Sequence, residues 1–306
     1  MKRNLFEKIA YGIKNPRLVA LQFIGDSFWR RIDDETFLKF EYKAWMGKTL
    51  HLNPPVTFNE KIQWLKLHDR KPIYTVLVDK YEVRNYIKEK IGEKYLVPLI
   101  GVWEKSEDVD FNALPNQFVL KPTHTSGNVF ICRNKADIDE KKIKKMLDEW
   151  LKREYYWGNR EWPYKNVQPR LIAEKMIDSN IVDYKFYCFD GEPKLLYLSQ
   201  GLEDHSTAAI SFFDLNLKKL PFGRSDYRPF DTEVIRPSNF DEMINIAKIL
   251  SKGFPFVRVD LYSVNNKIYF SELTLHPCAG YMPFQPEEYD RKLGDMLKLP
   301  QIEECE

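Results

Sequence analysis

The stretch FVRVDLYSVNNKIYFSELT, from Phe256 to Thr274, constrains the fold of this chain more than any other segment. Its first half, Val257 to Val264, alternates apolar with polar residues, which is typical of a strand with one buried face. Asn265 and Asn266 mark a turn, and a second strand follows from Ile268 to Thr274. The segment is therefore predicted to be a β-hairpin with one face in the core and one face carrying polar groups.

The length of the turn decides which side chains meet on the polar face. A three-residue loop that ends at Lys267 pairs Asp260 with Glu272 and Arg258 with Thr274. A two-residue loop puts Glu272 on the apolar face, so we predict the three-residue loop. Two carboxylates paired in this way repel by about 3 kcal/mol at an effective dielectric constant of about 20. Full solvation, a shared proton or a bound cation such as Mg²⁺ can each relieve that repulsion.

Composition limits the class of protein. The 306 residues suffice for two domains or one large one, and a content of 43% hydrophobic and 30% charged residues is typical of a soluble protein. The net charge of +2 does not favour a nucleic-acid partner. The four cysteines are scattered and form no CxxC, so the sequence predicts neither a zinc site nor a disulfide framework and fits a reducing, cytoplasmic compartment.

Residues 1–31 carry seven basic residues against Glu7 and Asp26, interleaved with apolar and aromatic side chains. Such a segment is either a helix on a membrane surface or an amphipathic helix packed on the protein, and both interpretations stay open. No stretch approaches the roughly 20 apolar residues of a membrane span. The segment also has no clear cleavage site, so we expect no signal peptide.

The remaining sequence predicts an α+β fold with an antiparallel-leaning sheet. The predicted secondary structure changes from mainly helices to mainly strands near residue 116, and a hinge is expected near Lys175. Helical spacing and capping residues predict helices over 57–67, 79–90, 139–156 and 240–250. Short apolar runs predict strands over 118–121, 129–132, 171–174, 184–189 and 194–198.

A short polar loop follows the predicted strand that ends at Lys121. The loop runs from Thr123 to Asn128 with Gly127 as its one glycine, and can turn backbone N–H groups and hydroxyls toward an anion. Lys121 can add a positive charge. This is not a Walker A motif, because GxxxxGK[ST] and a following helix are both lacking. A generic hairpin loop is the alternative.

Three further patterns have both a structural and a functional interpretation. Glu174 and Lys175 are either a surface ion pair or the flank of a backbone edge that binds a planar base. Asp183 and Lys185 lie on one face of a predicted strand and form either a salt bridge or part of a ligand site. Residues 108–110 form a DxD pattern, which in many sugar-nucleotide transferases holds a metal ion against a diphosphate.

Six stretches, in this order, resemble motifs of the ATP-grasp superfamily and specifically of its teichuronopeptide-biosynthesis (TupA-type) branch. They cover about residues 55–290 and read TFNEKIQWLKLHDR, DKYEVRNYIKEKIG, LPNQFVLKPTHTSGN, RLIAEKMI, DYKFYCFDGEPK and VRVDLYSVNNKIYFSELT. The resemblance implies two ATP-grasp subdomains, over 116–176 and 177–306, that close over ATP. A mainly helical region over 1–115 precedes them.

The resemblance also implies roles for individual residues. Those implied to contact ATP are Lys80, Lys121, Thr125, Ser126, Gly127, Glu174, Lys175, Met176, Ile177 and Asp183. Those implied to bind Mg²⁺ are Asp260, Glu272 and Thr274, the last at a position where the superfamily usually has asparagine. Arg258 is implied to steady the transferring phosphoryl group, and Lys185 to face phosphate or substrate.

The reaction implied by the family is ligation of a carboxylate to an amine through an acyl phosphate. By the same resemblance, the substrates are an amino acid or other amine and a uronic acid or similar carboxylate of a bacterial surface polysaccharide or its precursor. Residues 205–228 and 276–289 are candidates to face the second substrate. The alternatives are a glycosyltransferase that uses the DxD pattern, a kinase that stops at phosphorylation, and a non-catalytic ATP-binding protein.

Overall fold

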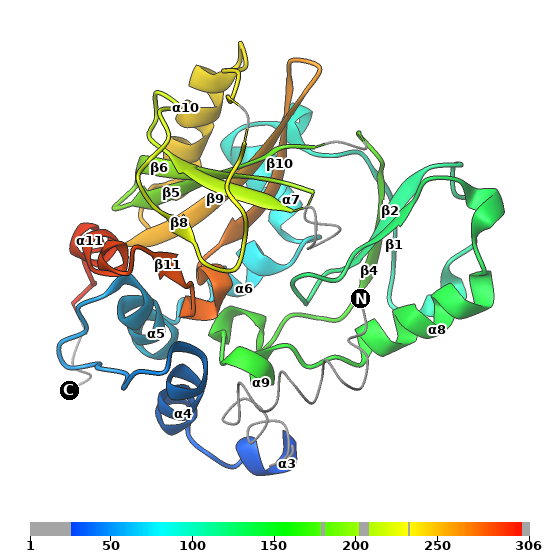
Figure 1. Ribbon diagram of the computed structural model, residues 1–306. Coiled ribbons are helices and arrows are strands. Elements are labelled where there is room, and N and C mark those ends of the chain that lie inside the picture. Colours follow the sequence, from blue (N-terminus) through cyan, green and yellow to red (C-terminus); the bar gives the residue numbers. More distant parts are fainter. Residues whose placement is uncertain (1–25, 179–180, 202–207, 232, 302–306) are drawn as a thin grey trace.

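Two antiparallel β-sheets with helices packed against them form the framework of the chain (Figure 1). A computed structural model describes residues 26–178, 181–201, 208–231 and 233–301. Within these ranges, the strand order is β1-β4-β2-β3 in the first sheet, β10-β9-β5-β6-β7 in the second and β11-β8 in a short ribbon. Neighbouring strands run antiparallel in all three. The predicted α+β class is therefore confirmed.

The first sheet consists of β1 (Leu99–Trp103), β2 (Phe118–Pro122), β3 (Phe130–Cys132) and β4 (Leu171–Lys175). One of its faces is buried under α8 (Glu140–Leu151), because Ile143, Leu147 and Trp150 of this amphipathic helix share a hydrophobic cluster with the inward residues of β2 and β4. The strand β1 belongs to this sheet although it precedes residue 116. The division of the chain at residues 115 and 176 remains a prediction.

The second sheet consists of β5 (Asp183–Phe189), β6 (Glu192–Gln200), β7 (Ala209–Phe213), β9 (Phe256–Val264) and β10 (Lys267–Thr274). One face packs against α10 (Phe240–Ser251), whose apolar side shares a hydrophobic cluster with β5, β6, β9 and β10. The opposite face is apolar at Tyr187 and Phe189. These two residues share a hydrophobic cluster with the helices over 58–68 and 288–296. Farther along the same face of β5 lie Lys185 and Asp183. This change from apolar to polar along one strand positions the candidate site.

The hairpin of β9 and β10 has the predicted register at its polar end but not the predicted turn. Asp260 pairs with Glu272 and Arg258 with Thr274, as expected. The turn has two residues, Asn265 and Asn266, whose φ angles are +51° and +59°, so the predicted three-residue loop was wrong.

A bulge between Phe270 and Glu272 supplies the extra residue in place of a longer loop. Because of this bulge, Phe270 and Leu273 both face the core while Glu272 faces the polar side. The bulged residue, Ser271, donates a 2.8 Å hydrogen bond from its hydroxyl to that of Tyr262. The bulge therefore reconciles a tight turn with the pairing of the two carboxylates.

The helices and short strands outside the two sheets surround them on several sides (Figure 1). The α-helices among them are α3 (Asp26–Trp29), α4 (Asp34–Met46), α5 (Phe58–His68), α6 (Ile73–Val78), α7 (Val83–Lys90), α9 (Tyr156–Asn159) and α11 (Glu288–Met296). The 3₁₀ helices are η1 (Glu93–Tyr95), η2 (Ser106–Asp108), η3 (Lys135–Asp137), η4 (Trp162–Tyr164) and η5 (Pro277–Gly280). The ribbon strands are β8 (Gly223–Arg224) and β11 (Phe284–Gln285).

Capping residues explain where several helices begin and end. Thr57 caps α5, and its hydroxyl and the Glu60 side chain form the reciprocal bonds of a capping box, which confirms the predicted start. The helix predicted over 79–90 begins only at Val83, since the Asp79 carboxylate accepts from the N–H groups of the two residues at 81 and 82. The helix predicted over 139–156 ends at Leu151.

Most of the basic segment over 1–31 lies outside the described residues, which begin at residue 26. In the described part, Trp29 is 7% exposed and joins a hydrophobic cluster with α4 and the η5 region. Among the helices in the described ranges, none has both the length and the apolar character needed to cross a bilayer.

Candidate active site

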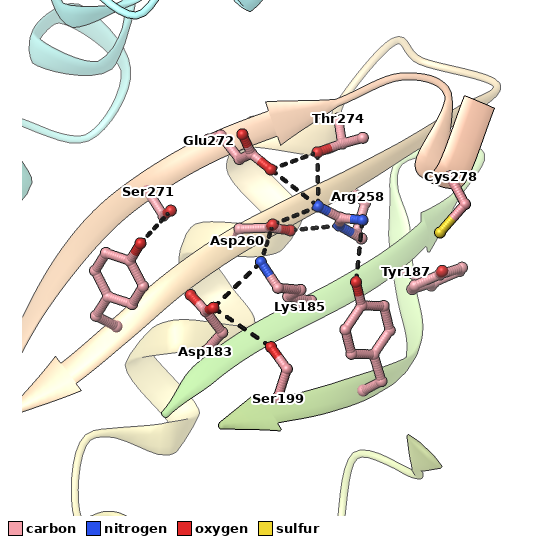
Figure 2. Close-up of polar contacts among 12 residues, drawn as sticks. Asp183, Lys185, Tyr187, Ser199, Arg258, Asp260, Ser271, Glu272, Thr274 and Cys278 are labelled. Atoms are coloured by element: carbon pink, nitrogen blue, oxygen red, sulfur yellow. Dashed lines mark hydrogen bonds and ion pairs between the residues drawn. The ribbon is translucent and has the colours of Figure 1, made fainter. Parts of the chain in front are cut away.

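Arg258 lies at the centre of a buried polar cluster on the second sheet (Figure 2). Its Nε donates to Oδ1 of Asp260 at 2.7 Å and its Nη2 to Oδ2 at 2.6 Å, a bidentate pair. Nη2 also donates to Oε1 of Glu272 at 3.0 Å and to the Thr274 hydroxyl at 2.9 Å. Nη1 donates to the Tyr197 hydroxyl at 3.2 Å. One guanidinium thus links two carboxylates on neighbouring strands.

Lys185 joins this cluster from β5, the other neighbour of β9. Its ammonium donates to Oδ2 of Asp260 at 2.6 Å and lies 3.5 Å from Oδ2 of Asp183 (Figure 2). The same Asp183 oxygen accepts from the Ser199 hydroxyl at 3.4 Å. The other oxygen, Oδ1, is buried and has no hydrogen-bond partner among the described residues. Asp183 and Lys185 therefore form the predicted salt bridge, and one carboxylate oxygen is left to accept a ligand.

Opposing effects set the charges of the cluster. Burial works to lower the pKa values of Lys185 and Arg258, but the neighbouring carboxylates outweigh it and raise both well above their usual values. Burial raises the pKa of Asp260, and Arg258 and Lys185 oppose that rise. Burial also works to raise the pKa of Glu272, yet Lys185, Arg258 and Lys80 lower it to about 2. Glu272 is therefore anionic at neutral pH.

The first sheet contributes a second group of charged residues. Lys121 donates to Oε2 of Glu174 at 2.8 Å, and Arg84 of α7 donates to Oε1 at 3.1 Å. Burial and Glu272 act in opposite directions on the pKa of Lys80, and burial prevails and lowers it. Burial works to lower the pKa of Lys121, whereas Glu174 and, more weakly, Glu272 raise it. Glu272 on the second sheet therefore acts on Lys121 of the first sheet and on Lys80, which lies between α6 and α7.

Hydrogen bonds from Lys80 and within the loop fix the conformation of the predicted phosphate loop. The ammonium of Lys80 donates to the carbonyl oxygen of Thr125, whose hydroxyl donates to Oδ1 of Asn128 at 3.1 Å. Gly127 has a φ of +78°, and a Cβ atom there would meet nothing within 4 Å. Ser126, the residue before it, lines a cavity beside the Arg258 cluster. The loop thus contributes Ser126 to that cavity, and the space beside Gly127 is open.

The structure contradicts one of the two interpretations of the segment from Glu174 to Ile177. Glu174 is paired with Lys121 and Arg84, whereas the Lys175 side chain is exposed, so the surface ion pair between Glu174 and Lys175 was wrong. The backbone N–H of Lys175 donates to the carbonyl oxygen of Pro98. Met176 and Ile177 follow the end of β4 and are half-buried. Their predicted contact with a planar base remains a prediction.

The chemistry of the paired carboxylates fits Mg²⁺. Asp260 is fully buried, so full solvation of the pair is excluded. The Glu272 side chain is 33% exposed and borders the cavity. Mg²⁺ typically takes one or two carboxylates and completes its shell with water and phosphate oxygens. Among the described residues no three His, Cys, Asp or Glu side chains gather as metal ligands, so an ion here depends on these two carboxylates, the Thr274 hydroxyl and ligand oxygens.

A cavity of about 450 Å³ adjoins the cluster. Arg258, Glu272 and Thr274 line it on the side of the second sheet, and Ser126 on the side of the phosphate loop. Arg224, Asp226, His276 and Cys278 also line it. They lie within 205–228 and 276–289, whose contact with a second substrate remains a prediction. Its remaining wall consists of Trp45, Tyr155, Asn159, Glu161, Tyr164, Ala279 and Tyr281.

Sequence reasoning missed the lining residues from α4, α9 and η4. Trp45 lies in an amphipathic helix, and Glu161 in a short connection that carries no motif. Arg84 was within a recognised stretch but had no assigned partner, because its contact with Glu174 joins residues 90 positions apart. A spacing pattern cannot reveal contacts of this kind.

The comparisons with known proteins identify the family of the chain. The model of the TupA-like ATP-grasp family matches residues 60–298 of the chain. The chain belongs to the TupA-like ATP-grasp family. This confirms the resemblance of the six stretches. A search of curated proteins gave no match.

Several solved structures of ATP-grasp ligases are similar to the chain. D-alanine–D-alanine ligase from Bacillus anthracis matches at 19% identity over 65% of this chain and 57% of that chain, with a TM-score of 0.38. Its complex with ATP matches at 18% identity over 72% and 65%, with a TM-score of 0.42. The ligase PsnB with a precursor variant, Mg and ADP matches at 14% over 88% and 70%, with a TM-score of 0.41. The TupA-like chain spans less than two thirds of the Bacillus anthracis ligase in both comparisons.

The DxD pattern has a structural role. Asp108 ends η2, the middle residue Val109 is 1% exposed within the cluster beneath α8, and Asp110 accepts the backbone N–H of Asn112 at 2.9 Å. Neither aspartate lines the cavity. The family membership and these contacts both disfavour the glycosyltransferase interpretation.

Proposed function

We propose that the protein is an ATP- and Mg²⁺-dependent ligase that joins a carboxylate to an amine. The observation that carries this proposal is the meeting of Lys185, Arg258, Asp260 and Glu272 in one buried cluster beside a cavity. Glu272 also lies within the electrostatic reach of Lys80 and Lys121 on the opposite side. Such an arrangement suits the transfer of a phosphoryl group, which depends on positioning and charge stabilisation more than on covalent chemistry.

The nucleotide binds between the two sheets in this proposal. Lys80 and Lys121 offset the negative charge of the phosphates, and the loop with Thr125, Ser126 and Gly127 covers them. The segment from Glu174 to Ile177 lines the adenine. Asp183 accepts a ribose hydroxyl, which the unpaired buried oxygen Oδ1 supports.

Mg²⁺, when bound by Asp260 and Glu272 with Thr274 nearby, supplies positive charge to the outer phosphates. Both carboxylates contact Arg258, which would orient them for a bound ion. Arg258 steadies the equatorial oxygens of the transferring group. Lys185 holds Asp260 in place and faces phosphate or substrate.

The reaction has two steps, and neither needs a covalent link to the protein. A substrate carboxylate oxygen attacks the γ-phosphorus of ATP, and the bond between that phosphorus and the bridging oxygen breaks, releasing ADP. The nitrogen of the neutral amine then attacks the acyl carbon, an amide bond forms and inorganic phosphate leaves. The amine loses one proton in this step.

The substrates that we propose are an amino acid or other amine and a carboxylate of a bacterial surface polysaccharide or its precursor. The TupA-type resemblance supports this choice. The cavity supports it as well, because aromatic rings beside polar groups suit a sugar or a small amine. We propose a cytoplasmic location, with the basic residues of 1–31 in peripheral contact with the inner face of the membrane.

The test of the ligase function is production of ADP. Full-length protein is incubated with Mg²⁺, ATP and combined pools of amines and sugar acids, and ADP and product masses are measured. We expect ADP and an amide, and strong loss of both in Glu272→Gln. A phosphorylated product without an amide indicates a kinase instead. Binding of ATP without formation of ADP, across all pools of amines and sugar acids, contradicts the proposal that the protein is an enzyme.

The membrane contact has a separate test. Full-length and Δ1–25 protein are sedimented with anionic liposomes, and the truncation stops at residue 25 because Trp29 is buried. We expect the full-length protein alone to pellet at low salt. Equal sedimentation of both contradicts the contact.

A further inference from the structure

Among the described residues, the cavity contains one carboxylate that forms no direct ion pair with a lysine or an arginine. The arginines in its wall, Arg224 and Arg258, are both paired with carboxylates at 2.6 Å. Glu161, by contrast, has one ionisable partner within 4 Å among the described residues, Nδ1 of His276 at 3.7 Å. Burial lowers the pKa of His276, so its ring is neutral at neutral pH. The His276 ring therefore brings no positive charge to the Glu161 carboxylate.

Glu161 is also buried, since its side chain is 7% exposed. A buried carboxylate without a cation is costly, so a site of this kind favours a positively charged ligand. Lys66 is close enough for Glu161 to influence its pKa, but the Lys66 ammonium donates to the carbonyl oxygens of Asn159 and Ala279, at 2.8 Å and 2.6 Å. Burial lowers the pKa of Lys66 to about 8. Lys66 therefore stays largely charged at pH 7, but it makes no direct ion pair with Glu161 among the described residues, so the carboxylate can still contact a ligand.

Aromatic rings complete the surroundings of Glu161. The rings of Tyr155 and Tyr164 lie 4.7 Å apart, and those of Trp45 and Tyr281 are stacked at 6.4 Å. All four residues line the cavity. Glu161 lines the same cavity, so the rings and the carboxylate border one shared space. Aromatic faces beside a carboxylate are a recognised environment for an ammonium group.

We propose that Glu161 and the four surrounding rings bind the positively charged amino group of the amine substrate. The inference rests on the proposed ligase function and specifies its second substrate as a small cation, such as an amino acid or a primary amine. Glu161 lines the same cavity as Arg258 and Glu272, so the bound amine is held beside the phosphoryl-transfer cluster. The proton that makes it a cation passes to the Glu161 carboxylate before the neutral nitrogen attacks.

Binding of simple probes without nucleotide tests this proposal. Full-length protein is titrated at pH 7 with L-alaninamide, ethanolamine and putrescine, and with their uncharged counterparts lactamide, ethylene glycol and 1,4-butanediol. Ligand-observed NMR gives the dissociation constants. We expect each cation to bind about tenfold or more tightly than its counterpart, which corresponds to about 1.4 kcal/mol.

Two variants and one control locate the site. Glu161→Gln is expected to weaken binding of the cations about tenfold and to leave the uncharged probes unchanged. Trp45→Ala, at a side chain that is 52% exposed, is expected to weaken binding of the cations about two- to fivefold. Glu149→Gln, an exposed carboxylate of α8 outside the cavity, is expected to bind as the unchanged protein does.

The proposal is overturned if no cation binds, if both probe sets bind equally, or if Glu161→Gln binds as tightly as the unchanged protein. If circular dichroism shows that Glu161→Gln is unfolded, the Trp45→Ala variant tests the proposal instead. Unchanged affinity of Trp45→Ala for the cations also overturns the proposal. Since no ATP is present, a failure to form ADP does not alter these constants. In an active ligase, Glu161→Gln is further expected to raise KM for the amine about tenfold and leave KM for ATP unchanged.

Discussion

Arg258 shows how much of the site depends on single side chains. It is 6% exposed and donates to two carboxylates and two hydroxyls on three different strands. Any change at one of these partners leaves the others with an unbalanced charge in a region of low dielectric constant. Stability and function are therefore coupled at this residue.

Replacement of Asp260 by asparagine tests that coupling. Asp260→Asn leaves Arg258 and Lys185 buried without their common carboxylate, so we expect the free energy of unfolding to fall by about 3–5 kcal/mol. Urea denaturation measures the change. The exposed Asp108→Asn serves as the control and should differ from the unchanged protein by less than about 0.5 kcal/mol. An equal, small effect of both substitutions contradicts the central role of the cluster.

Glu272 predicts a dependence of stability on pH. Its pKa is about 2 in the folded protein against an ordinary value of 4.5. A lowered pKa contributes stability above the ordinary value, and this contribution is lost as the pH falls from about 4.5 toward 2. The gap in urea midpoint between the unchanged protein and Glu272→Gln should therefore narrow between pH 5 and pH 2.5. A constant gap over this range contradicts the assigned pKa.

At the scale of the element, the hairpin of β9 and β10 shows what the sequence can and cannot predict. Alternation predicted both strands and the pairing of Asp260 with Glu272, because a slip would bury a carboxylate. The bulge at Ser271 was not predictable from alternation, since a longer loop gives the same pairing. The strands β1 and β7 were missed because neither alternates in burial.

The two asparagines of the turn give a prediction about the hairpin. Both have positive φ, which a β-branched residue adopts only with strain. We expect Asn266→Val to lower the free energy of unfolding by about 1–2 kcal/mol and Asn266→Gly to leave it unchanged or higher. Both are made in a Ser238→Ala background, because the Ser238 hydroxyl donates to the Asn266 side chain at 2.9 Å. Equal stabilities of the two variants contradict a left-handed turn.

At the scale of the whole molecule, the candidate site lies where three parts of the chain meet. The first sheet supplies Lys121 and Glu174, the second sheet supplies the Arg258 cluster, and α4 and the α9 region supply part of the cavity wall. Local patterns predicted the polar residues on each sheet, since each lies in a recognisable strand. They did not predict the cavity wall, because it depends on how distant helices pack.

A site shared between two sheets predicts that nucleotide and metal stabilise the whole protein together. At concentrations about 100-fold above the dissociation constant, ATP with Mg²⁺ should raise the melting temperature by roughly 5 °C. Excess EDTA should remove most of this shift, because Asp260 and Glu272 repel the phosphates without an ion. Differential scanning fluorimetry measures both. A shift that survives EDTA contradicts the metal site.

The contribution of Trp45 from α4 and of Glu161 from the stretch after α9 has a consequence for how such proteins diversify. Most of the groups that we propose to face the nucleotide lie on strands or on the loop after β2, whereas those that we propose to face the amine lie on surrounding helices and connections. Mutations can therefore alter the choice of acceptor while the phosphate chemistry stays intact. Exchange of α4 and the α9 region between relatives offers a practical way to redirect such a protein toward new amide products.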